Sequence, residues 1–310
     1  MTSQLKVDRI SPATGSEIII DGLEHRNKNL IINGAMTVSQ RGETFDKTGY
    51  TLDRWYVGSS GYNISRGTAP HQFDYSLKCT RPTTDTHFIF QRIELDRIGK
   101  PGIFKQGEEF TVSCWVKGTA GAGFKASMAF SEGTGGGETR ENWNGDSGDN
   151  RMTLTGGWDR YERTFSVDQP CNPSHNSVCL TLAYYGTAVN QSVWFTGVQV
   201  EKGSMATEFE HEFVSETLAK CQRYHENSHR TCYVGMVGGW INNGHGAIRS
   251  TISFNTLKRG QPTITYFYVP ANWNAFTISR SNQGFVTELS TSTSTSDVRP
   301  GFHWVADMEL

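Results

Sequence analysis

The sequence lacks an excess of charge of one sign, and it lacks long apolar runs. Its formal net charge is -2, from 29 Lys and Arg against 31 Asp and Glu, and no basic cluster rises above the background. Nucleic acid is therefore not predicted as a partner. No stretch of about 18 apolar residues occurs and no apolar segment follows a basic N-terminus, so we predict neither membrane insertion nor a signal peptide.

The sequence also lacks the cysteine spacings of metal and redox sites. None of its six cysteines forms a C-x-x-C pair, which argues against a zinc ribbon and a thioredoxin-type site. Cys171 and Cys179 could close a loop as a disulfide, and the even count keeps disulfides possible. Because Cys114 lies in an apolar strand and Cys221 on the inner face of a predicted helix, we expect free, mostly buried thiols.

Motifs for nucleophilic catalysis and phosphate binding are missing as well. The sequence contains no G-x-S-x-G elbow and no G-x-x-x-x-G-K-[ST] loop. The segment from His225 to His229 matches H-E-x-x-H, but Asn227 and Ser228 are weak helix formers, so we interpret the match as coincidental. We predict no catalytic residue, no metal site and no cofactor.

What the chain does contain is typical of an all-β protein. It has 310 residues, 33 of them Gly, and 12% of its residues are aromatic. These features favour many short strands joined by tight turns, and the length is sufficient for two domains.

Short β-rich segments recur from Asn29 to about Glu212 without an intervening helix, which predicts a two-sheet jelly-roll sandwich. Phe110, Val112 and Cys114 alternate with Thr111, Ser113 and Trp115, as in a strand with one face packed inward. The expected strands are Leu30–Ile32, Arg54–Gly58, Gln72–Cys79, Phe88–Ile93, Glu109–Val116, Lys125–Phe130, Arg160–Val167, Val178–Tyr184 and Val193–Val200.

The predicted sandwich ends in a junction. The last strand is broken around Thr196-Gly197 and closed by a turn at Lys202-Gly203-Ser204. Beyond it we predict one helix with Ser215 as N-cap, and the boundary between two folded units near Phe213. The helix has Glu216 in its first turn, and its inner face is expected to contain Leu218, Cys221 and Tyr224.

After the helix, β signals return and predict a smaller C-terminal β domain. The chain ends in the apolar run Trp304–Leu310, which we expect to be tied into a sheet at a subunit contact. At the other end, residues 1–28 are polar with one apolar pulse at Ile18–Ile20, and form either an attachment arm or a partly disordered tail. The expected C-terminal strands are Tyr233–Val237, Ala247–Phe254, Thr263–Tyr268, Phe276–Ser279, Gly284–Glu288 and Gly301–Met308.

Four sequence motifs, in order, resemble those of bacteriophage tail-fibre and receptor-binding proteins. They are NLIINGAMTVSQRG with YTLDRW, QRIE with FTVSCWVKG, WFTGVQVEKGSMATEFEHE followed by LAKCQRY, and GFHWVADMEL. Together they span most of the chain from Asn29 onward, and their order carries the resemblance. In that family a carbohydrate-binding-like sandwich is followed by a terminal domain at this junction.

The resemblance implies a virion location and a division into three parts. Residues 1–28 would form the arm that binds other virion proteins, 29–212 the carbohydrate-binding-like jelly roll, and 213–310 the helix and C-terminal domain for trimerisation or receptor contact. It implies a homotrimer that recognises a host cell-surface glycan without catalysis. A structural virion component, such as a head fibre or decoration protein, and a glycan depolymerase are the alternatives.

Aromatic residues are the candidates for glycan contact, because sugars stack their C–H faces on exposed rings while polar neighbours fix the hydroxyls. Trp143, Trp240 and Trp273 are each flanked by Asn and fit this description, and the alternative is that these rings anchor turns. By contrast Trp55, Trp115 and Trp194 lie in apolar strand runs and are expected in the core.

The long polar segment Ser131–Met152 contains Trp143 and is expected to be a surface loop, either a contact surface or a solvated connection. Its acidic residues do not follow the spacing of an EF-hand, so we interpret them as solvated charge rather than as a calcium site. They are Glu138, Glu141, Asp146 and Asp149.

Overall fold

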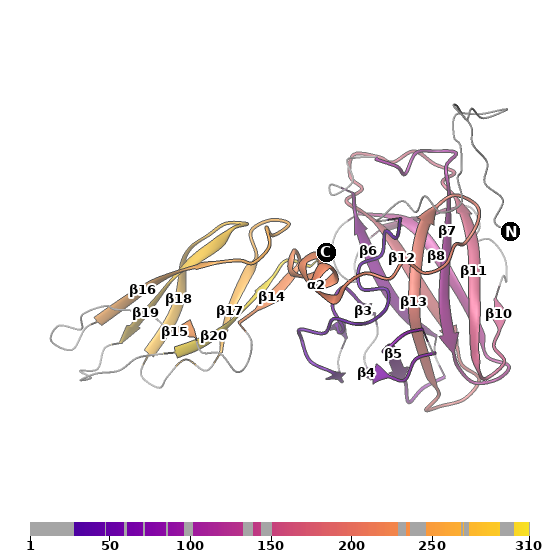
Figure 1. The fold of residues 1–310 in the computed structure, drawn as a ribbon, viewed down its shortest axis with the longest axis horizontal. Helices are drawn as coiled ribbons and strands as arrows, with labels where there is room; N and C mark the ends of the chain where they lie inside the picture. The colour runs from indigo at the N-terminus through magenta and orange to yellow at the C-terminus, as the bar shows by residue number, and fades with distance from the viewer. Residues whose placement is uncertain are drawn as a thin grey trace, which may run out of the picture.

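The fold is nearly all β, as the composition predicts, and contains two sheets that face each other and a smaller pair of sheets beyond a helix (Figure 1). The computed structural model describes residues 28–46, 48–58, 61–70, 72–84, 86–95, 102–132, 139–143, 151–228, 234–235, 246–267, 269, 273–291 and 301–309. No helix among these residues has the length and apolar character needed to cross a membrane.

The first sheet of the sandwich has the strand order β1-β4-β5-β13-β7-β11, and every neighbouring pair is antiparallel. Its strands are β1 (Thr44–Phe45), β4 (Asn63–Gly67), β5 (Ser76–Thr80), β7 (Glu109–Lys117), β11 (Trp158–Ser166) and β13 (Ser192–Lys202).

The second sheet has the order β10-β8-β12-β6-β3-β2, with β9 also paired to β8. From β5 to β8, and again from β11 to β13, successive strands alternate between the two sheets, which gives the jelly-roll arrangement that was predicted. The strands are β2 (Gly49–Tyr50), β3 (Tyr56–Val57), β6 (His87–Glu94), β8 (Gly123–Glu132), β9 (Thr139–Asn142), β10 (Met152–Thr153) and β12 (Ser177–Tyr185).

Residues that alternate along the strands fill the space between these sheets. In β12 the inward residues Val178, Leu180, Leu182 and Tyr184 are fully buried and belong to one continuous core. The residues between them, such as Cys179 and Ala183, are covered on the other face, so β12 is buried on both sides. Burial of each large apolar side chain stabilises the sandwich by about 1.5–3 kcal/mol.

The predicted break in the last strand is confirmed. The register of β13 shifts between Thr196 and Gln199, and Gly197 in this bulge has a φ of +59°, a conformation that glycine adopts without strain. Gly203, in the predicted closing turn, has a φ of +119°.

The single described helix, α2 (Val214–Gln222), begins two residues earlier than predicted. Its N-cap is Phe213, which makes no side-chain cap hydrogen bond, so the prediction of Ser215 as N-cap is wrong. The inner face was predicted correctly, because Cys221 and Tyr224 are fully buried and Leu218 packs against them. The helix lies between the sandwich and the C-terminal sheets (Figure 1).

The C-terminal strands form two small sheets around their own core of Ile252, Phe285, Leu289, Phe302, Trp304 and Ala306. Strand β20 (Gly301–Asp307) pairs with β14 (His225–Asn227), β15 (Val234–Gly235) and β17 (Thr263–Phe267), so the apolar C-terminal run is tied into a sheet as expected. The other sheet contains β16 (Gly246–Ser253), β19 (Gly284–Thr291) and β18 (Trp273–Arg280).

Some local predictions were wrong. The expected strand Leu30–Ile32 is irregular and leads into a turn in which Asn33 and Met36 have positive φ values of 60° and 59°. The predicted surface loop 131–152 contains β9, which folds back on β8 and carries Trp143 inward. Residues 1–27 of the predicted arm lie outside the described part of the chain.

Candidate functional site

The outer face of the first sheet carries a row of aromatic and cationic side chains. The backbone register aligns Trp158 of β11 with Lys117 of β7, then Trp194 of β13 and Lys78 of β5. The same row continues through Ser65 and Thr44. We call these six residues the tryptophan row. Because neighbouring strands lie about 4.8 Å apart, the row crosses roughly 24 Å of sheet surface.

The row faces away from the core. Its neighbours along the strands, Val116 and Phe195, are fully buried between the sheets, whereas Trp158, Lys117 and Trp194 are only half-buried. Alternation along each strand therefore turns the row outward.

Trp194 lies between two ammonium groups. Lys78 Nζ is 5.3 Å and Lys117 Nζ is 5.4 Å from the centroid of the Trp194 ring. At these distances the cations interact with the π-system of the ring. Gly67 makes room for it, since a β-carbon there would lie 2.7 Å from Trp194 Cδ1.

A third indole, that of Trp115, lies beside the row. Trp115 pairs in register with Arg160, whose Cζ is 5.9 Å from the Trp115 ring centroid. Arg160 also makes a 3.2 Å ion pair with the exposed Glu162. This part of the outer face thus combines three indole rings with three cations, one of which is paired with Glu162.

At the β1 end, the row opens into a hollow of about 430 Å³. Hydroxyl, amide and carboxylate groups line it together with the ammonium of Lys78, so it combines donors and acceptors of the kinds that bind sugar hydroxyls. The polar lining residues are Thr44, Asp46, Asn63, Ser65, Lys78 and Thr80.

The placement of the tryptophans corrects the sequence-based assignment. Trp143 was predicted to stack on a glycan, but it is 1% exposed and packs among Phe104, Phe110 and Phe130 in the core. That prediction is wrong, because a buried ring offers no face to a sugar. Trp115 and Trp194 were expected in the core and lie on the outer face instead.

The other two predicted contact residues keep their status as predictions. Trp240 lies outside the described residues, and of Trp273 only the backbone, in β18, is described. Trp55 is fully buried, as expected, and its Nε1 donates a 3.0 Å hydrogen bond to the carbonyl of Asn33.

The outer face of the second sheet also carries aromatic rings, but its cations have protein partners. Tyr50, Tyr56 and Phe90 are aligned across β2, β3 and β6. Arg92 is 2% exposed, lies 5.4 Å from the Tyr56 ring centroid and donates to the Tyr50 hydroxyl. Arg140 stacks 4.3 Å from Phe90 and donates to Thr181.

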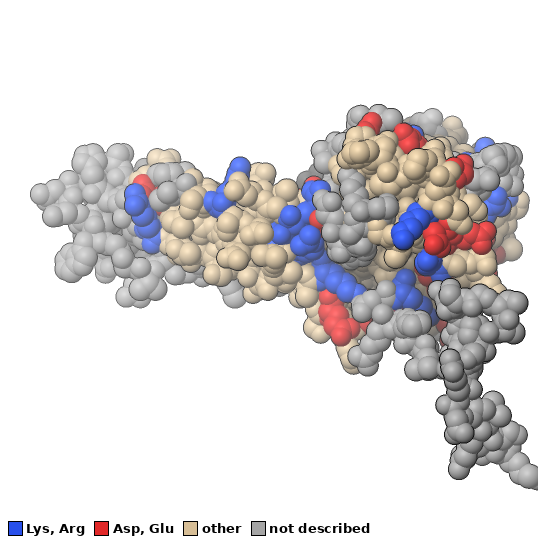
Figure 2. Space-filling model, turned by 90° about the horizontal axis from the view of Figure 1, so that it is seen from above, with Lys and Arg blue, Asp and Glu red and all other residues tan. Residues whose placement is uncertain are grey.

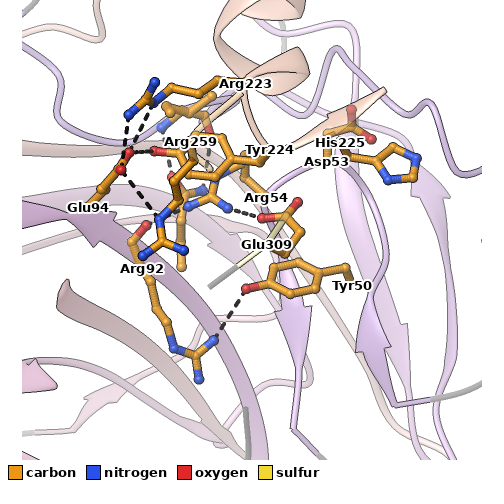
Figure 3. Close-up of polar contacts among 12 residues, drawn as sticks. Tyr50, Asp53, Arg54, Arg92, Glu94, Arg223, Tyr224, His225, Arg259 and Glu309 are labelled. Atoms are coloured by element: carbon orange, nitrogen blue, oxygen red, sulfur yellow. Dashed lines mark hydrogen bonds and ion pairs between the residues drawn. The ribbon is translucent and has the colours of Figure 1, made fainter. Parts of the chain in front are cut away.

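This second face leads into a buried ionic cluster at the junction of the sandwich, helix α2 and the C-terminal sheets (Figure 3). We call it the seam cluster. Figure 2 shows Lys and Arg side chains gathered along this junction on the face seen from above. The members of the seam cluster are Arg41, Asp53, Arg54, Glu94, Arg223, Tyr224, His225, Arg259, Asp307 and Glu309.

Glu94, at the end of β6, is the acceptor at the centre of the cluster. Its carboxylate accepts hydrogen bonds from Arg223 Nε at 3.1 Å, Arg223 Nη2 at 3.0 Å and the Tyr224 hydroxyl at 2.8 Å, and Arg259 Nε lies 3.3 Å away. Burial alone raises the pKa of Glu94, but the hydrogen bonds and charges of these partners outweigh it and lower the pKa below the usual value.

The end of the chain forms the other half of the cluster. Glu309 accepts hydrogen bonds from the buried Arg54 and from Arg41, and Arg41 also binds Asp307 at 3.1 Å. Cζ of Arg54 lies 3.5 Å from the centroid of the Tyr224 ring, which follows the end of α2. These contacts fix the C-terminal strand and the helix on the sandwich.

A second buried ion pair braces the helix from the C-terminal side. Lys258 and Glu226 are 1% and 2% exposed and form an ion pair, and Lys258 Nζ also donates to the backbone carbonyl of Gln222 at the end of α2. Glu226 accepts a further 2.8 Å hydrogen bond from Asn255. The glutamate of the H-E-x-x-H match is therefore a structural anchor.

The structure argues against metal chemistry in this segment. His225 and Glu226 lie in strand β14 rather than on a helix, so the i, i+4 ligand geometry of a zinc protease is absent, and His229 lies outside the described residues. Burial lowers the pKa of His225 even though Asp307 lies 3.3 Å from its Nδ1. Within the described parts of the chain, His, Cys, Asp and Glu form no group suited to a metal ion.

A small cavity of about 120 Å³ lies where the linker before α2 crosses the sandwich. Phe73, Phe209 and His211 stack at its wall, with ring centroids 5.0–5.3 Å apart. Of its carboxylates, Glu210 accepts the backbone N–H of Asn29 and Glu212 binds Lys220. Asp74 is the third carboxylate in the lining.

No protein-family model matches the chain, and no curated protein matches it. Solved structures with weak similarity include the CBM22-1 xylan-binding domain of Paenibacillus barcinonensis Xyn10C, with 17% identity and a TM-score of 0.34, covering 53% of this chain and 94% of that one. The N-terminal cellulose-binding domain of Cellulomonas fimi β-1,4-glucanase C has 13% identity and a TM-score of 0.33, covering 55% and 100%.

A third similar structure is the enzymatically active domain of tailspike protein 4 of bacteriophage CBA120. It has 15% identity and a TM-score of 0.35, and the match covers 57% of this chain and 22% of that chain.

Proposed function

We propose that the chain binds a cell-surface glycan across the tryptophan row, without covalent chemistry. The observation that carries this proposal is the outward alignment of Trp158 and Trp194 with lysines and hydroxyl groups in one row. Flat indole faces suit the C–H faces of sugar rings, and hydroxyl and ammonium groups suit their oxygens.

The row and the hollow at its end form a continuous surface, because Lys78 and Ser65 belong to both. An extended oligosaccharide could therefore stack on the indoles and place a terminal or branching sugar in the hollow. Trp240 and Trp273 are proposed as further glycan contacts in the C-terminal part, on the basis of their flanking asparagines alone.

The biological setting that we propose is a bacteriophage tail fibre, in which the chain acts as a homotrimeric receptor-binding protein. Residues 1–28 would attach to other virion proteins, 29–212 would bind the glycan, and 213–310 would contribute trimer contacts. The ordered motifs support this setting, as do apolar side chains that remain exposed around the linker: Met205 at 73%, Phe213 at 78% and Val214 at 56%. Three copies would strengthen weak sugar binding through avidity.

The binding proposal is tested by applying the purified chain to an array of bacterial surface glycans. We expect binding that weakens in Trp194→Ala and Trp158→Ala. The matched control is Tyr75→Ala, which removes a ring that is 38% exposed and stacks with Arg66 outside the row. If Tyr75→Ala weakens binding as much as the Trp variants do, the row is not the site, and if no glycan binds, a structural role in the virion is favoured.

The trimer is tested separately by measuring the mass of the chain in solution at micromolar concentration. A mass near three times 34.5 kDa is expected, and a monomer would refute this part of the proposal. Incubation with a bound polysaccharide should release no new reducing ends. Their release would favour a depolymerase.

A further inference from the structure

We infer that the glycan recognised at the tryptophan row is anionic, with a carboxylate or phosphate group that Lys78 and Lys117 bind on either side of Trp194. This inference rests on the proposed function and specifies its ligand class. The charges of the row support the anionic ligand, whereas its rings support the glycan site.

The first step is the position of the two ammonium groups. Lys78 and Lys117 are in register with Trp194 from opposite sides, and each Nζ lies within 5.4 Å of the ring centroid. A sugar that contacts this indole would lie next to both ammonium groups. An acidic substituent on that sugar would therefore meet a cation.

The second step is that these cations have no carboxylate of their own. Among the residues that the structure describes, neither Lys78 nor Lys117 takes part in an ion pair, whereas Lys202 binds Glu108 and Lys220 binds Glu212. Both lysines are half-buried, so part of their hydration is already removed. Partly desolvated, unpaired ammonium groups favour an anionic ligand more strongly than fully solvated ones.

The third step is the local balance of charge. The charged groups beside Trp194 are Lys78 and Lys117. The carboxylates of this outer face lie away from Trp194: Glu162 pairs with Arg160, Glu201 is buried and accepts hydrogen bonds from Thr207, and Glu109 lies at the far end of β7. Asp46 is the carboxylate in the adjoining hollow. The excess positive charge is thus concentrated at Trp194, where a ring would stack.

The test uses a panel in which each uronic-acid oligosaccharide is paired with its carboxyl-reduced, neutral counterpart, together with phosphate-bearing and phosphate-free pairs. We expect the acidic member to bind more tightly, and its affinity to fall as salt rises from 0.05 to 0.5 M. The two sets of pairs distinguish carboxylate from phosphate as the recognised group.

The variant Lys78→Gln with Lys117→Gln keeps the side-chain stems and removes both charges. We expect it to weaken the binding of the acidic ligand about tenfold more than the binding of its neutral counterpart. Lys202→Gln with Lys220→Gln makes the same change in net charge at lysines that already have partners, and should have little effect on either ligand.

The outcomes separate this inference from the proposed function. Equal binding of acidic and neutral members, unchanged in the Lys78/Lys117 variant, would overturn the anionic ligand and leave the glycan site intact. An equal loss in both double variants would also overturn it, because the effect would then be one of overall charge. Binding to no member of the panel would instead count against the glycan site itself.

Discussion

The outer faces of the two sheets both place cations near aromatic rings, yet they serve different ends. On the second face, Arg92 and Arg140 bind Tyr50 and Thr181, and Glu94 at the strand end joins the seam cluster. On the first face, the lysines beside Trp194 have no described carboxylate partner. The contrast separates outward rings whose polar neighbours are engaged by the protein from rings whose cationic neighbours have no described carboxylate partner, and this difference is why the glycan site is proposed on the first face.

The largest expected effect follows from removing the central acceptor of the second face. Glu94→Ala would leave Arg223 and Arg259 without their shared carboxylate in a buried setting, and should lower the free energy of unfolding by about 3–5 kcal/mol. Urea denaturation at pH 7 measures this change.

The matched control on the first face is Glu162→Ala, which breaks an ion pair whose glutamate side chain is 51% exposed. It should cost less than about 1 kcal/mol. Similar losses for both variants would show that the seam cluster contributes no more than a surface pair.

The second prediction concerns the pH dependence of stability that arises from His87, in the same strand as Glu94. Burial, with the nearby charge of Arg81, lowers the pKa of His87 from 6.5 to about 4. Between these two pH values the imidazole of His87 is protonated in the unfolded chain but not in the folded chain. The contribution of neutral His87 to the free energy of unfolding is therefore complete above pH 6.5 and is lost as the pH falls towards 4. The loss corresponds to about 3 kcal/mol.

Urea denaturation between pH 7 and 4.5 tests this sign. His87→Phe keeps the ring contacts with Tyr62 and Tyr184 and removes the titrating group. Stability of the variant should therefore fall less steeply with acid than that of the original chain. Parallel curves would contradict the assignment to His87.

The third prediction concerns glycan binding by Trp194 on the outer face of the first sheet. Trp194→Ala should weaken glycan binding about 30-fold, in the range of a central contact residue in a binding site, while lowering the stability of the fold much less than it lowers affinity. Isothermal titration with the best glycan of the array measures the first effect, and thermal unfolding measures the second. A variant that loses stability and affinity together would mean that Trp194 supports the sandwich rather than the ligand.

The smallest expected effect is at the cysteines. Cys79, Cys114, Cys171, Cys179 and Cys221 are free, as predicted, and four of the five are buried. Burial raises the pKa of Cys114 to about 12. The buried thiols should therefore not react with a thiol reagent in the folded chain at pH 8. Peptide mapping after the reaction identifies which cysteines were modified. Rapid reaction of four or more of these five cysteines would contradict the packing.

The sequence predicted the sandwich because alternation in strands such as Glu109–Lys117 is a local signal. The same alternation places Trp115 on the other face of the strand from Cys114 and Phe110, and could have assigned Trp115 to the outer face. The apolar residues around Trp115 instead suggested a position in the core. Trp143 was hidden by the polar loop around it, since only the return of β9 onto β8 turns it inward.

The seam cluster could not be predicted from local pattern. Glu94 and Arg223 are 129 positions apart, and Arg54 and Glu309 are 255 apart, so their pairing depends on how the sandwich, helix and final strand come together. The tryptophan row likewise becomes visible only when the register of six strands is known.

The most direct test of the glycan site is a nitrogen-15 NMR titration that follows the indole N–H signals of the eight tryptophans as the glycan is added. The account predicts that the signals of Trp194, Trp158 and Trp115 shift together, while those of the buried Trp55 and Trp143 stay in place. Shifts confined to Trp240 and Trp273, with the outer-face indoles unchanged, would contradict it.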